Sequence, residues 1–70
     1  MPDPITVVVN GQEREFGGEM SLTDFLQALD LDPQAVVVEL NKEIVRRPAL
    51  GATTVRNGDQ VELVHFVGGG

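Results

Sequence analysis

The chain ends in three glycines, Gly68, Gly69 and Gly70. A terminal glycine presents a carboxylate with no Cβ beside it, on a backbone that enters φ/ψ regions closed to other residues. Such an end can pass through a narrow channel into the active site of another protein. Residues 67–70, if fully extended, reach roughly 13 Å beyond a folded body. The glycines therefore predict that the Gly70 carboxylate reacts in a second protein, with Gly68 and Gly69 threading its active site.

A run of glycines at the end of a chain is also typical of a frayed terminus or a remnant of cloning. The other side chains do not supply a competing site. The sequence has no Cys and a single His, His65, so it offers neither a thiolate nor an obvious nucleophile–base pair. Its eleven Asp and Glu residues are typical of a solvated surface. We therefore expect no catalytic site, no metal site and no bound cofactor in this chain.

Length and charge narrow the class of protein. Seventy residues with 41% hydrophobic content predict one small domain, residues 1–66, followed by a tail at residues 67–70. The formal net charge of −6 disfavours binding to nucleic acid or anionic lipid and favours a basic protein partner, although such a charge also simply keeps a domain soluble. No apolar run is long enough to span a membrane and the start lacks the features of a signal peptide. We expect a cytoplasmic protein that is a monomer on its own.

The first part of the chain predicts a β-hairpin. The run Ile5–Val9 is rich in β-branched residues and predicts a strand whose odd-numbered positions share one face. Asn10-Gly11 follows directly and is a strong signal for a type I′ turn, because both central positions of that turn need positive φ. Residues 12–16 alternate polar and charged side chains, as expected of an edge strand that runs back. Gly17-Gly18 then ends the strand.

An amphipathic helix follows the hairpin. Ser21 is placed to cap its first turn, with Asp24 three positions further on. Apolar residues then recur at the helical spacing i, i+3, i+4 and i+7, which predicts a helix of about ten residues that packs on the sheet. We expect Asp32-Pro33 to end it, because the residue before a proline avoids the α region. The apolar positions are Leu22, Phe25, Leu26 and Leu29.

The second half of the chain predicts two or three more strands. Residues 36–41 form an apolar run, and Asn41-Lys42 suits a turn into a short edge strand at Ile44-Val45. Residues 49–56 are expected to be irregular, with room for one helical turn. Asn57-Gly58-Asp59 predicts a tight turn into the last strand, residues 61–66.

One helix between a hairpin and later strands predicts an α+β fold of the β-grasp type, with a mixed four- to five-stranded sheet and one main helix on one face. The first and last strands should pair in parallel at the centre through a right-handed crossover. Val61 and Leu63 should then face the helix. Apolar residues on the uncovered face next to the tail exceed what an isolated monomer needs, so we interpret this face as a partner-docking patch. The predicted patch residues are Val8, Glu62, Val64, Phe66 and Val67.

In this arrangement the chain resembles the sulfur-carrier proteins of thiamine thiazole biosynthesis, a ubiquitin-like β-grasp family. The resemblance covers essentially the whole chain. It is most specific at Asn41–Val45, at Asn57–Leu63 and at the ending Val64–Gly70. One departure is Arg46, because relatives often have proline before the arginine that Arg47 matches, and this leaves the exit from the edge strand open.

The resemblance implies a carrier and not an enzyme. An E1-like adenylating enzyme would use ATP to convert the Gly70 carboxylate into an acyl adenylate. A persulfide from a cysteine desulfurase or a rhodanese-like sulfur donor would displace AMP, and reduction would leave a thiocarboxylate on Gly70. Thiazole synthase would then accept the sulfur. ATP is thus used by the partner, and the carrier itself is expected to bind no cofactor.

Three alternative functions share parts of this pattern. The small subunit of molybdopterin synthase has the same fold and terminal thiocarboxylate, but its tail usually carries prolines before the last glycines, and none precedes them here. A ubiquitin-like modifier would form isopeptide bonds to lysines instead of accepting sulfur. A plain interaction domain would form no acyl adenylate at all.

Overall fold

The computed structural model describes residues 3–65, so Phe66, Val67 and the three glycines lie outside the described residues. The predicted boundary between a domain at 1–66 and a tail at 67–70 stays a prediction for the same reason. The elements in chain order are β1 (Ile5–Val9), β2 (Gln12–Phe16), β3 (Met20–Ser21), α1 (Leu22–Ala28), the 3₁₀ turn η1 (Pro33–Ala35), β4 (Val36–Leu40), β5 (Glu43–Val45), α2 (Arg47–Leu50), β6 (Thr54–Val55) and β7 (Gln60–His65).

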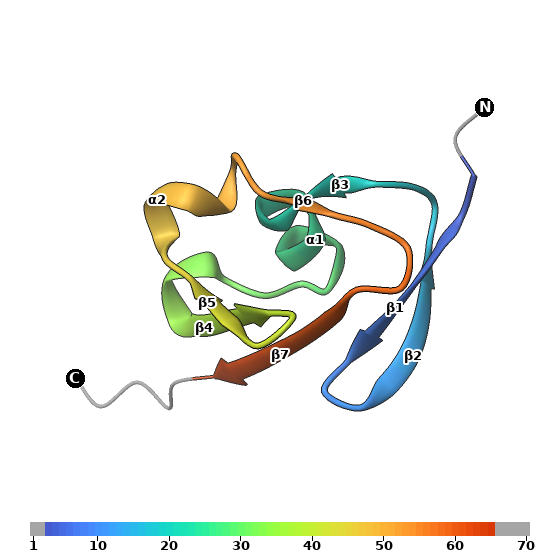
Figure 1. The fold of residues 1–70 in the computed structure, drawn as a ribbon. Helices are drawn as coiled ribbons and strands as arrows, with labels where there is room; N and C mark the ends of the chain where they lie inside the picture. The colour runs from blue at the N-terminus through green and yellow to red at the C-terminus, as the bar shows by residue number, and fades with distance from the viewer. Residues whose placement is uncertain (1–2, 66–70) are drawn as a thin grey trace.

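A mixed five-stranded sheet has the order β2-β1-β7-β4-β5, and helix α1 packs on one of its faces (Figure 1). The first and last strands pair in parallel, with Val8 opposite Gln60. The other neighbour of β7 is β4, which pairs with it in antiparallel fashion from Val36 to Leu40. The predicted α+β β-grasp arrangement, with the first and last strands side by side at the centre, is confirmed.

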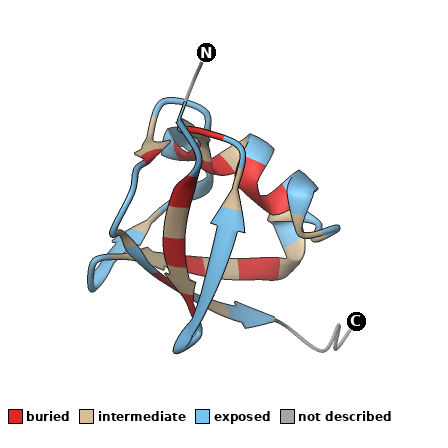
Figure 2. Ribbon diagram, turned by 90° about the vertical axis from the view of Figure 1, so that its right-hand side faces the viewer, coloured by how far each residue is buried: buried red, intermediate tan, exposed pale blue. Residues whose placement is uncertain are grey.

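The core lies between the sheet and α1. Along β1 the odd-numbered residues are buried and the even-numbered ones half-buried, and Figure 2 shows this alternation on the strand beside the exposed β2. Val61 on β7 is fully buried and Leu63 packs against the core, as predicted. Each such aliphatic side chain contributes about 1.5–3 kcal/mol when buried. The buried apolar residues are Ile5, Val7, Val9, Leu22, Phe25, Leu26, Val36, Val38, Leu50, Val55 and Val61.

Helix α1 begins as predicted but ends earlier. The Ser21 hydroxyl oxygen accepts a hydrogen bond from the Asp24 N–H at 3.1 Å, which confirms the cap. The helix has seven residues and not about ten. It stops because Asp30 adopts a φ of 61° and the Leu31 N–H bonds back to the Leu26 carbonyl at 2.9 Å. This is the geometry of a Schellman cap, in which glycine is the usual left-handed residue, so the chain has already left the helix before Asp32-Pro33.

Residues 49–56, which were expected to be irregular, include the end of α2 and the whole of β6. Helix α2 is a single turn that begins two residues earlier than expected, at Arg47, and Leu50 at its end is buried. Strand β6 then pairs with β3, with Met20 opposite Val55, and this two-stranded ribbon was not predicted. Two residues per strand are too few to show any apolar periodicity, which explains the omission.

The side chains of two turn residues, Asn10 and Asn41, form hydrogen bonds with the backbone of the central strand β7 from opposite sides. Asn10 and Gly11 have φ values of 49° and 82°, which confirms the type I′ hairpin turn. The Asn10 side-chain oxygen accepts a hydrogen bond from the Leu63 N–H at 2.7 Å, and its amide donates to the Leu63 carbonyl at 3.3 Å. On the other side of β7, the Asn41 side-chain oxygen accepts from the Gln60 N–H at 2.9 Å. Both turns therefore extend the hydrogen bonding of β7 beyond its paired strands.

Replacing Asn10 tests how much this side chain stabilises β7. Asn10→Ala removes both side-chain hydrogen bonds and places an alanine at positive φ, so we expect the free energy of unfolding to fall by about 2 kcal/mol. Asn10→Gly tolerates the same φ and should lose only about 1 kcal/mol. Urea denaturation followed by far-UV circular dichroism measures both variants. An Asn10→Ala protein as stable as the wild type would show that the amide does not hold the strand.

Candidate functional site

The predicted tail follows β7, the middle strand of the five-stranded sheet. Strand β7 lies between β1 and β4, and its last described residue, His65, is opposite Val36 at the start of β4. The predicted sulfur-accepting residue Gly70 and the threading residues Gly68 and Gly69 follow after His65, outside the described residues. Near the tail, Val64 and His65 pair with Val37 and Val36 of β4, which gives the tail a fixed starting point. The fold therefore sets where the tail begins relative to the rest of the surface.

Three of the predicted docking residues lie on the face of the sheet that α1 leaves uncovered. Val64 is 58% exposed, which is unusual for a valine in a central strand. Glu62 precedes it by two positions on the same face and is also exposed. Val8 lies on this face in β1 but is half-buried, so it offers less surface than expected. Phe66 and Val67, the other two predicted docking residues, lie outside the described residues.

Two further apolar residues on this face were missed by the sequence reasoning. Val37 is directly opposite Val64, and Ile44 on β5 is opposite Glu39. Ile44 is 61% exposed, the other large exposed hydrophobic residue besides Val64 among the described residues. Alternation of side chains along residues 36–40 places Val37 on this face. Because residues 36–38 are all valine, the sequence shows no contrast between apolar and polar positions that would distinguish the two faces. We call Val37, Glu39, Ile44, Glu62 and Val64 the outer patch.

The outer patch combines apolar surface with negative charge. Glu39 and Glu62 are directly opposite each other on adjacent strands, an arrangement of like charges that destabilises a sheet. On the other side of the face, Glu13 and Glu15 of β2 lie opposite Val8 and Thr6. A basic residue of a partner would relieve this repulsion. The surface is therefore suited to a partner with an apolar centre and basic groups around it.

Two kinds of feature are absent from the described residues. Within residues 3–65, no three His, Cys, Asp or Glu side chains are grouped so as to hold a metal ion. No helix in this range is long and apolar enough to cross a membrane. His65, at the end of β7, is exposed.

Several proteins similar to this chain carry names from thiamine biosynthesis. The model of the ThiS family matches residues 7–70. A crystal structure of a thiamine biosynthesis protein (ThiS) from Geobacter metallireducens superposes with a TM-score of 0.82 at 40% identity, covering 94% of this chain and all of that one. The sulfur carrier protein ThiS of Bacillus subtilis is 38% identical over 50 residues, which are 71% of this chain and 76% of that protein.

Two longer enzymes contain a similar region. A thiazole synthase of Paramagnetospirillum magneticum is 41% identical over 64 residues, which are 91% of this chain and 20% of the enzyme. A thiazole synthase of Magnetococcus marinus is 39% identical over 62 residues, or 89% of this chain and 19% of the enzyme. The chain thus spans about a fifth of the length of these two relatives.

The like-charged pair on the outer patch gives a stability prediction. Glu62→Lys replaces repulsion with attraction to Glu39, so we expect the free energy of unfolding to rise by about 0.2–1 kcal/mol. Glu13→Lys on β2 is the control, because it changes the net charge equally but lies opposite Val8 and not opposite an acid. Thermal and urea denaturation at low salt measure both. An equal gain in the control would attribute the effect to net charge and not to the Glu39–Glu62 pair.

Proposed function

Because this chain belongs to the ThiS family, we propose that it is a sulfur carrier in thiamine biosynthesis and that the Gly70 carboxylate accepts the sulfur. The observation that supports this most directly is that the family match runs through residue 70 and therefore includes all three glycines. Strand β7, which leads to them, pairs with β1 at Gln60 and Val61 and with β4 as far as His65. In this role the chain is a co-substrate, and the bond-making groups belong to its partners.

The proposed chemistry begins with activation of a poor electrophile. The Gly70 carboxylate attacks the α-phosphorus of ATP in an E1-like adenylating enzyme, which forms an acyl adenylate and releases pyrophosphate. A persulfide sulfur, from a cysteine desulfurase or a rhodanese-like donor, then attacks the acyl carbon and AMP leaves. A thiol reduces the resulting acyl disulfide, so that the S–S bond breaks and a thiocarboxylate remains. Glycine at positions 68–70 keeps the reacting carbon unhindered in each step.

We propose thiazole synthase as the acceptor of this sulfur. The support is the similarity between this chain and a region of two thiazole synthases, which implies that a domain of this kind is useful close to that enzyme. Names from thiamine biosynthesis among the relatives favour this pathway over the molybdopterin alternative. The thiocarboxylate is both anionic and nucleophilic at sulfur, so it can attack an electrophilic carbon of the growing heterocycle directly.

The folded body supplies the affinity for these partners. Ordering each tail residue costs about 1–2 kcal/mol in backbone entropy, so contacts elsewhere must offset that loss. The outer patch lies at the base of the tail and offers exposed Val64 beside acidic Glu62. Val8, Phe66 and Val67 complete the proposed docking patch. A basic, partly apolar surface around the active-site entrance of the adenylating enzyme would match it.

Removal of Gly70 tests the site of sulfur transfer. A chain truncated after Gly69 should fold and bind the adenylating enzyme, but it places its carboxylate one residue short and should accept no sulfur. Intact-mass spectrometry after incubation with adenylating enzyme, ATP, sulfur donor and a thiol measures the replacement of one oxygen by sulfur. The full chain is the positive control. A thiocarboxylate on the truncated chain would show that Gly70 is not the required acceptor.

Substitution in the docking patch tests the source of the affinity. Val64→Asp places a charge where a desolvated apolar contact is proposed, so we expect the dissociation constant for the adenylating enzyme to rise about tenfold or more. Phe66→Ala should weaken binding in the same direction. Gln27→Asp, on the exposed side of α1, is the control with the same added charge. Titration calorimetry measures all three. Unchanged affinity for Val64→Asp would mean that the docking surface lies elsewhere.

A further inference from the structure

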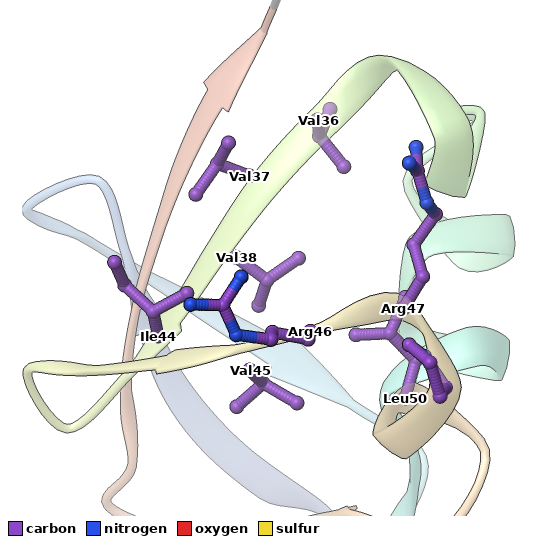
Figure 3. Close-up of a pocket in the computed structure, with 9 residues that line it drawn as sticks. Val36, Val37, Val38, Ile44, Val45, Arg46, Arg47 and Leu50 are labelled. Carbon is purple, nitrogen blue, oxygen red and sulfur yellow. The ribbon is translucent and has the colours of Figure 1, made fainter.

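A groove between β4, β5 and α2 overlaps the outer patch at Val37 and Ile44. Its volume is about 340 Å³, within the range of about 300–1,000 Å³ typical of ligand pockets. Figure 3 shows the valines of β4 and β5 along it, with Arg46 just before α2 and Arg47 at the start of that helix. The lining residues are Val36, Val37, Val38, Ile44, Val45, Arg46, Arg47, Pro48 and Leu50.

The groove exists because β5 leaves the sheet early. Strand β5 pairs with β4 only at residues 38–40, whereas β7 pairs with β4 along its whole length. After Val45 the chain turns into α2, with Pro48 in the first turn of that helix. Val36 and Val37 therefore have a paired strand on the β7 side and none on the β5 side. An extended peptide can lie where β5 would have continued, as in other cases of strand addition to an open sheet edge.

The groove is positive in a chain that is otherwise acidic. None of its lining residues is acidic, although the chain has eleven Asp and Glu residues. The Arg47 Nη1 donates a hydrogen bond to the Gln34 carbonyl at 3.2 Å, which holds this side chain at the far wall. Arg46 is exposed, and its guanidinium lies near Ile44 in Figure 3. Within residues 3–65 the ion pair that the structure shows joins Arg56 and Glu19, so neither groove arginine pairs with a carboxylate there.

The groove lies at the end of the sheet from which the tail departs. His65 is opposite Val36, a residue of the groove wall, and Val64 is opposite Val37, which the groove shares with the outer patch. Strands in a sheet are about 4.8 Å apart, so the position vacated by β5 is only about 10 Å from the β7 backbone. A protein that contacts the chain at the end of β7 on its way to Gly70 is therefore within reach of this groove.

From these observations we infer that the groove binds an extended segment of the adenylating enzyme in which apolar residues accompany an Asp or Glu. This inference rests on the proposed function, because that function identifies the enzyme that must reach the tail. An apolar side chain of the segment packs on Val37 and Ile44. Its carboxylate pairs with the Arg46 guanidinium, whose fork geometry suits a bidentate contact. A phosphate group or a small anion would meet the guanidinium but leave the apolar wall uncovered.

The groove and the outer patch favour partner groups of opposite charge. Glu39 and Glu62 favour basic groups over the outer patch, whereas Arg46 favours an acidic group one strand further on. A partner that satisfies both must carry basic and acidic groups in a fixed order across about two strand spacings. A partner rotated on the same patch would bring like charges together, which costs binding energy. The pair of sites thus fixes the orientation in which the enzyme receives the tail.

Charge reversal at Arg46 tests the inference. Arg46→Glu should raise the dissociation constant for the adenylating enzyme about tenfold, as expected for loss of a charge-assisted pair. Arg14→Glu, on exposed β2 at the opposite edge of the sheet, is the control with the same change in net charge and should stay within about twofold of wild type. Urea denaturation verifies that both variants fold. An equal loss in both variants, or no loss in Arg46→Glu, overturns the inference.

Cross-linking identifies the occupant. A photoreactive benzoylphenylalanine in place of Ile44 should cross-link to a stretch of the enzyme that contains Asp or Glu, and the same group at Glu15 on β2 should not reach that stretch. A cross-link to a stretch without acidic residues, or none to the enzyme from position 44, overturns the proposal. Intact-mass measurement of sulfur transfer separates the two hypotheses. If wild type accepts sulfur while Arg46→Glu binds normally, the groove proposal fails and the proposed function stands; if wild type neither binds nor accepts sulfur, the proposed function fails.

Discussion

The constraint on which the rest of the structure depends is the pairing of the last strand with a neighbour on each side. Strand β7 is held in parallel to β1 and antiparallel to β4, and the amides of Asn10 and Asn41 add hydrogen bonds beyond both ladders. The inner face of β7 is buried through Val61, so register is fixed by packing as well as by hydrogen bonding. Every feature proposed to meet a partner is placed relative to this strand.

The distribution of charge follows from the way the strands are ordered. The acidic residues on the uncovered face come from β2, β4 and β7, whereas Arg46 and Arg47 lie where β5 leaves the sheet. Glu39 and Glu62 are placed opposite each other, an arrangement of like charges that costs stability. The same face carries exposed Val64. The repulsive Glu39–Glu62 pair and the exposed apolar side chain of Val64 therefore lie close together, near the end of β7.

Much of the fold was predictable because its signals are local. Asn10-Gly11 and Ser21 specify a turn and a cap through their own side chains and backbone preferences, and both are confirmed. The early end of α1 was not predictable, since Asp30 takes the left-handed position that glycine usually marks. The exposure of Ile44 and the groove beside it depend on where β5 parts from β4, which is a matter of tertiary packing. Their sequence signals are a single apolar residue and a pair of arginines, and neither is specific.

The two ladders beside β7 also determine how the domain responds to mechanical force. A pull on the tail along the axis of β7 would load the hydrogen bonds to β1 and β4 together, in shear, and not one after another as in the peeling of an edge strand. Rupture would require many bonds to fail at once. An enzyme that binds the terminal glycines and pulls on them can therefore load β7 without unfolding the small core.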